Sequence, residues 1–107
     1  MIAELLQNAG LNARHVRFLK PPAGTYAVWL DDIETDGGDN QKSGIFTHNY
    51  TVEIYAPAPD DASERAMENA LDAAGIQYMK QDRYWLQDEQ RYQTVYDFVI
   101  TNKERDS

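Results

Sequence analysis

The segment that decides the fold is residues 45–56, IFTHNYTVEIYA, where mostly apolar and mostly polar positions alternate. Successive side chains of a β-strand point to opposite faces of a sheet, so a period of two predicts a strand with one buried face. The face expected to be buried holds Phe46, His48, Tyr50, Val52, Ile54 and Ala56. The opposite face holds Thr47, Asn49, Thr51 and Glu53.

The residues before this segment predict a second strand and a long connection. Residues 25–33 read as a strand with Tyr26, Val28 and Leu30 on one face and Ala27 and Trp29 on the other, so we expect both of its faces to be partly covered. The sequence Pro21-Pro22-Ala23-Gly24 separates this strand from a basic connector at residues 14–20. The sequence Asp36-Gly37-Gly38-Asp39-Asn40 is a strong turn signal. We expect the two strands to pair antiparallel, with residues 31–43 as an acidic tip.

Helical spacing appears at two places. Residues 2–9 predict a short helix that ends at Gly10, with a left-handed cap and a hydrophobic contact from Leu11. The pair Asp60-Asp61 offers an N-cap for a second helix, Glu64 completes a capping box with Asp61, and Gly75 ends that helix.

The rest of the chain predicts two further strands. Residues 76–86 read as one strand with an irregularity at residues 80–82, residues 92–100 read as the last strand, and residues 101–107 read as a polar tail. The expected fold is α+β, in the order α-β-β-α-β-β. It consists of an antiparallel four-stranded sheet with both helices on one face, in a single domain of residues 1–107. The other face is left uncovered with apolar side chains, which indicates a partner or an oligomer; these are Trp29, Met79, Trp85, Val95 and Val99.

Composition excludes several classes of protein. The chain has 107 residues and a net charge of -8, which disfavours nucleic-acid binding and docking on anionic membranes. Cysteine is absent, so disulfide scaffolds, thiolate zinc sites and cysteine nucleophiles are excluded. No signal peptide or apolar span is apparent, and we expect synthesis in a reducing, intracellular compartment.

The acidic stretch is the first candidate for chemistry. Asp32, Glu34 and Asp36-Gly37 have the spacing that opens an EF-hand loop, but Ser43 stands where a bidentate Glu is required. Asp31 and Asp32 are strand neighbours that point to opposite faces, which disfavours a catalytic metal site. We interpret the stretch as a solvated tip or, functionally, as a contact loop.

No other residue pattern indicates catalysis or a cofactor. His48 lies on an apolar strand face, where a histidine is typically a hydrogen-bonded core residue. Phosphate-binding glycine motifs are missing from the sequence. The aromatic and arginine residues near Arg83 are interrupted by acids, which favours a cross-strand structural cluster over base stacking.

Taken together, the chain resembles the tail terminator, or tail completion, proteins of long-tailed phages and prophages. The resemblance rests on the short first helix, the connector ending in Pro21-Pro22, the hairpin with an acidic tip and two further stretches. These stretches are Ala73-Ala74-Gly75-Ile76 and the closing hairpin from Asp82-Arg83-Tyr84-Trp85-Leu86 to Tyr96-Asp97-Phe98.

The resemblance implies a non-enzymatic structural subunit. Members of this family form rings, usually hexameric, that cap the tail tube and join it to the head. It implies partners in tail-tube and head-connector proteins, a location in the host cytoplasm during assembly and then in the virion tail, and no catalytic residue or cofactor. The interaction residues that we select from the sequence are Trp29, Asp31, Asp32, Glu34, Asp36, Asp39 and Trp85.

Two other functions stay open at this point. A small acidic phage inhibitor could mimic DNA by spacing carboxylates like phosphates. A metal-dependent enzyme is the third, disfavoured hypothesis.

Overall fold

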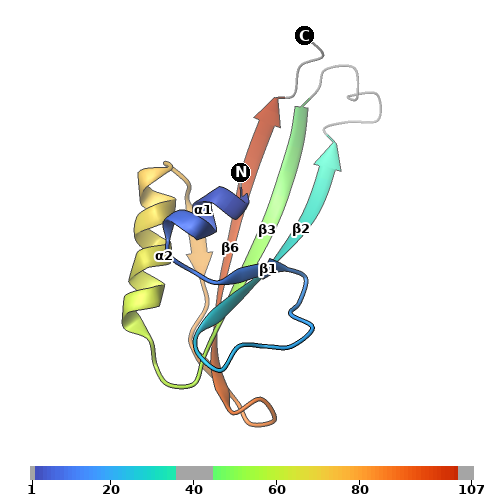
Figure 1. The fold of residues 1–107 in the computed structure, drawn as a ribbon. Helices are drawn as coiled ribbons and strands as arrows, with labels where there is room; N and C mark the ends of the chain where they lie inside the picture. The colour runs from blue at the N-terminus through green and yellow to red at the C-terminus, as the bar shows by residue number, and fades with distance from the viewer. Residues whose placement is uncertain (1, 36–44, 104–107) are drawn as a thin grey trace.

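The computed structural model describes residues 2–35 and 45–103. It contains two helices, α1 (Ile2–Asn8) and α2 (Asp61–Ala73). Its strands are β1 (Ala13–His15), β2 (Tyr26–Thr35), β3 (Ile45–Ala56), β4 (Tyr78–Lys80), β5 (Tyr84–Leu86) and β6 (Arg91–Lys103). Both helices lie on one side of the sheet (Figure 1).

The sheet is mixed, which corrects the predicted four-stranded antiparallel sheet. Five of its six strands follow the order β1-β2-β3-β6-β4, and the sixth, β5, also pairs with β6. The pairs β2–β3 and β3–β6 are antiparallel, as are the short pairs of β4 and β5 with β6, whereas β1 and β2 are parallel. The predicted order α-β-β-α-β-β is therefore wrong at two places.

The first additional strand lies in the stretch that we predicted to be only a basic connector. Helix α1 ends as expected: Gly10 has φ 76°, and the amide of Leu11 donates to the carbonyl of Leu6 at 3.1 Å. The chain then leaves in extended conformation, and Ala13–His15 pairs with residues 27–29 of β2. Three residues are too few to show a period of two, so the sequence pattern missed this strand.

The second difference is the break between β4 and β5. One strand was predicted for residues 76–86, but residues 81–83 separate two short ones. Lys80 and Arg83, on either side of the break, both reach carboxylates of α2. The register along β6 shifts by one residue across the break, since Lys80 is opposite Tyr96 and Tyr84 is opposite Gln93, as at a β-bulge.

The last strand is longer than predicted. Residues 101–103, expected to begin the polar tail, pair through their backbone with residues 45–47 of β3. As a result β2, β3 and β6 form a ribbon that projects beyond both helices (Figure 1). We call residues 30–35, 45–49 and 99–103 the projecting ribbon.

The core lies between the helices and the sheet face that the 45–56 pattern indicated. Tyr50, Val52 and Ile54 of β3 are buried there against Leu6 of α1 and Met67 of α2. Burial of such side chains contributes about 1.5–3 kcal/mol each, so this face decides on which side the helices pack. Within the described residues, no helix is long and apolar enough to cross a membrane.

Candidate functional site

The acidic residues selected from the sequence do not form one cluster. Asp31 lies on the helix-facing side of β2 and its carboxylate is 3.0 Å from Nδ1 of His48, whose side chain is only 12% exposed. The His48 ring also stacks on Tyr50, with ring centroids 5.4 Å apart. Asp31 and His48 thus stabilise the base of the projecting ribbon, which agrees with the interpretation of His48 as a hydrogen-bonded residue.

The other acidic residues selected from the sequence lie apart from Asp31 and His48 or outside the described residues. Asp32 is exposed on the opposite face, where it pairs in register with Asn49. Glu34 belongs to β2 and is opposite Thr47. Asp36 and Asp39 fall outside the described residues.

The two tryptophans also differ from the sequence prediction. Trp29 was placed on the uncovered face, but it is opposite Val52 and packs against the core, with its ring stacked on His15 at a centroid distance of 4.1 Å. A tryptophan alternating with buried residues on both sides gives no sequence signal for the choice of face. Trp85 is 43% exposed, and its indole donates to Gln87 at 2.9 Å.

The sheet face opposite the helices is only partly exposed to solvent. Tyr26, Val28 and Val95 are buried on it, and residues 16–25 fold back against Tyr26. Phe18 meets Tyr26 edge-on at 5.1 Å, and the Arg91 guanidinium lies 5.1 Å from the Tyr26 ring. Arg91 also donates to the carbonyls of residues 22, 23 and 24 at 2.8–3.0 Å, so it fastens this loop to the sheet.

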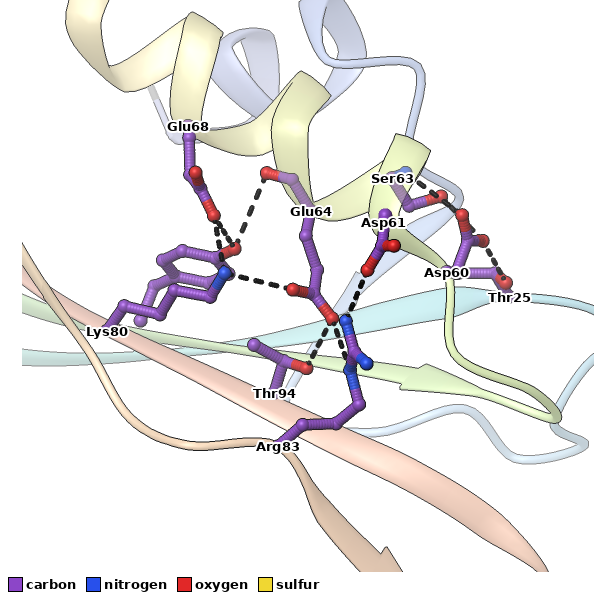
Figure 2. A network of polar contacts seen from close by, with 10 residues as sticks. Thr25, Asp60, Asp61, Ser63, Glu64, Glu68, Lys80, Arg83 and Thr94 are labelled. Carbon is purple, nitrogen blue, oxygen red and sulfur yellow. Dashed lines mark hydrogen bonds and ion pairs between the residues drawn. The ribbon is translucent and has the colours of Figure 1, made fainter.

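The densest group of ionisable side chains lies between α2 and the broken β4–β5 segment (Figure 2). Glu64, only 8% exposed, accepts from Arg83 Nε at 2.8 Å, pairs with Lys80 Nζ at 2.9 Å and accepts from the Thr94 hydroxyl at 3.0 Å. Glu68 accepts from Lys80 at 2.8 Å and from the Tyr96 hydroxyl at 2.7 Å. We call Glu64, Glu68, Lys80, Arg83, Thr94 and Tyr96 the α2 network.

The pKa values show what the α2 network does. Burial raises the pKa of Glu64, but hydrogen bonds from Arg83, Lys80 and Thr94 outweigh it and lower that pKa overall. Glu68 follows the same pattern, with Lys80 and Tyr96 as its donors. Its hydrogen bond, in turn, raises the pKa of Lys80. Every carboxylate is held ionised and every cation protonated, which favours a structural role over proton transfer.

Sequence reasoning assigned Glu64 to a capping box, which is wrong. Asp60 is the N-cap: its carboxylate accepts from the Ser63 amide at 3.0 Å and from the Thr25 hydroxyl at 2.7 Å. Glu64 is then free to face the sheet. The spacing of Glu64 and Glu68, four residues apart on one helix face, was the available signal for the network.

Among the described residues, no group of three or more His, Asp or Glu side chains is arranged to hold a metal ion. Buried side-chain nitrogen and oxygen atoms in the same part of the chain all have a hydrogen-bond partner. No protein-family model matches the chain, and no curated protein has a significantly similar sequence.

The surface that remains as a candidate site is the projecting ribbon with its two edges. Strand β1 pairs with β2 only at residues 27–29, and β4 pairs with β6 only at residues 96–98. In the described part of the chain, residues 30–35 and 99–103 therefore have no strand on their outer sides. Such edges offer free backbone groups to another chain.

Proposed function

We propose that this protein is a non-enzymatic structural subunit that assembles into a ring at the head–tail junction of a long-tailed phage or prophage. The observation that carries self-association is the projecting ribbon, whose two outer edges lack neighbouring strands over residues 30–35 and 99–103 in the described structure. The type of particle, the hexameric count and the location in the virion tail rest on the family resemblance of the sequence.

The two edges support a ring because they are different surfaces. Strand β2 provides one and β6 the other, and these two strands run in the same direction, since each is antiparallel to β3. A contact between unlike surfaces is repeated from copy to copy, and it closes into a ring when the rotation allows. The α2 network supports a structural role in another way, since its ionisable groups are satisfied within the subunit.

The direct test is the mass of the purified protein in solution. Light scattering coupled to size-exclusion chromatography, from about 1 μM to 1 mM, should show a concentration-dependent rise to a discrete oligomer that electron microscopy resolves as a ring. A strict monomer at the highest concentration, unchanged by addition of tail-tube protein, would contradict the proposal.

One observation favours the second candidate, an acidic inhibitor that mimics DNA. The uncovered face holds carboxylates on three successive cross-strand rows: Glu53 opposite Val95, Asp97 opposite Thr51 and Asp32 opposite Asn49. Successive rows are about 7 Å apart along the strands. These acids form no ion pair within the described structure.

A competition assay separates the two candidates. An inhibitor would remain monomeric and would displace labelled duplex DNA from a DNA-binding protein of the host, with an affinity that falls as salt rises. A ring subunit would form oligomers and would leave the DNA complex intact.

A further inference from the structure

We infer that a basic loop at one edge of the sheet docks into a groove at the opposite edge of the next copy. This inference rests on the proposed head-to-tail assembly and adds a side-chain contact to the contact proposed for the ribbon edges. The basic loop is residues 14–20. The β6 groove is the hollow where the α2–β4 connection, residues 74–77, meets residues 97–100 of β6.

The basic loop combines positive charge with exposed apolar side chains. It contains Arg14, Arg17 and Lys20, and no acid lies between Glu4 and Asp31 in a chain of net charge -8. Leu19 is 89% exposed and Val16 is 54% exposed, although both are aliphatic. The loop therefore presents exposed apolar surface directly beside positive charge, a combination that suits a contact surface.

The backbone of the loop is strained at one residue. Val16 has φ 72°, and the amide of Arg17 donates to the carbonyl of His15 at 2.8 Å, which closes a three-residue γ-turn. A β-branched residue rarely adopts this left-handed conformation. The Val16 amide donates to the backbone carbonyl of Trp29 at 2.9 Å, which joins the turn to β2. Strain held in this way is typical of functional segments.

The β6 groove has the complementary character. Its volume is about 750 Å³, and Met79 and Val99 in its lining are 75% and 53% exposed. Asp97 provides a carboxylate in the same lining. Burial, followed by the charges of Glu68 and Asp72, raises the pKa of Tyr78 in the same lining, whereas the charge of Lys80 lowers it. Apolar and basic side chains of a second copy therefore suit this groove.

The positions of the two surfaces exclude docking within one chain. Strands β1 and β4 stand at opposite ends of the sheet order, so the loop at β1 and the groove beside β4 lie at opposite edges of the sheet. We assign the groove to the basic loop of a second copy, because two copies of an acidic protein attract each other best where basic residues of one meet acidic residues of the other. Each copy then has one loop and one groove, as a ring requires.

Two variants test the pairing. Leu19→Asp disables the loop and Met79→Arg disables the groove, and both side chains are mostly exposed, so folding should be retained and is checked by circular dichroism. Leu19→Met and Met79→Leu are the matched controls that keep an apolar side chain. We expect each disabling variant to weaken self-association by about 30-fold or more, and the controls to associate as the wild type does.

A mixture of the two variants is decisive. The Leu19→Asp chain keeps its groove and the Met79→Arg chain keeps its loop, so one contact can form and the expected species is a 1:1 dimer that does not grow. If the wild type forms oligomers and both variants do too, the docking is wrong and the ring proposal survives. If the variants are monomeric and their mixture is too, head-to-tail docking of these surfaces is wrong. A monomeric wild type contradicts the proposed function itself.

Discussion

Glu64→Gln should destabilise the protein by removing the negative charge at the centre of the α2 network. The Glu64 side chain is 8% exposed and receives hydrogen bonds from Arg83, Lys80 and Thr94. A hydrogen bond to a charged group contributes about 1.5–3 kcal/mol, and breaking a fully buried ion pair costs about 3–5 kcal/mol. The glutamine also turns an amide donor toward two cations.

The expected loss of stability is smaller than the cost of breaking a fully buried ion pair, because the two cations are partly solvated. The Arg83 side chain is 29% exposed and that of Lys80 is 38% exposed, so water can hydrate both cations once the Glu64 carboxylate is gone. We therefore expect Glu64→Gln to lower the free energy of unfolding by about 2–3 kcal/mol at pH 7. For a domain of this size the midpoint of thermal unfolding should fall by roughly 8–15 °C.

The effect of Glu64→Gln should disappear in acid. The pKa of Glu64 is lower in the folded protein than its ordinary value of 4.5. Its stabilisation is therefore complete above the unfolded-state pKa and is lost as the pH falls through the folded-state pKa. Urea unfolding of wild type and variant should give a difference that is constant from pH 6 to 8 and shrinks steadily below about pH 4.

A matched control uses the same arginine. Asp61 also pairs with Arg83, but its side chain is 79% exposed. Asp61→Asn should therefore cost less than about 1 kcal/mol. The reasoning is refuted if Glu64→Gln costs no more than Asp61→Asn, or if its cost at pH 3 equals its cost at pH 7.

Three further predictions concern single contacts. Arg91→Met should cost about 1–2 kcal/mol and speed amide exchange at residues 23–25, because three carbonyls lose their donor; unchanged exchange would contradict the clamp. Asp60→Ala should lower the free energy of unfolding in urea by about 1–2 kcal/mol, since it removes the N-cap and the hydrogen bond from Thr25; a loss below about 0.5 kcal/mol would contradict this. Gly75→Ala should cost about 1 kcal/mol through its φ of 72° alone, as no atom lies within 4 Å of the added methyl group, whereas Gly24→Ala should be nearly neutral.

The sequence by itself determined the elements whose signals are long or chemically specific. The alternation at residues 45–56 gave β3 with its correct bounds and its buried face. Gly10 and Gly75 marked the ends of both helices, because left-handed caps favour glycine whatever the rest of the chain does. Such signals are local, so a single sequence carries them.

The tertiary structure decided which segments pair and which way ambiguous residues face. Strand β1 has three residues and exists because α1 delivers the chain beside β2. Trp29 faces the core because its register with Val52 places it there, although the alternation around it fits either face. Glu64 left the predicted capping box because Arg83, 19 residues away, offers its buried carboxylate a charged partner. In each case the deciding energy comes from residues distant in the sequence, which no local pattern contains.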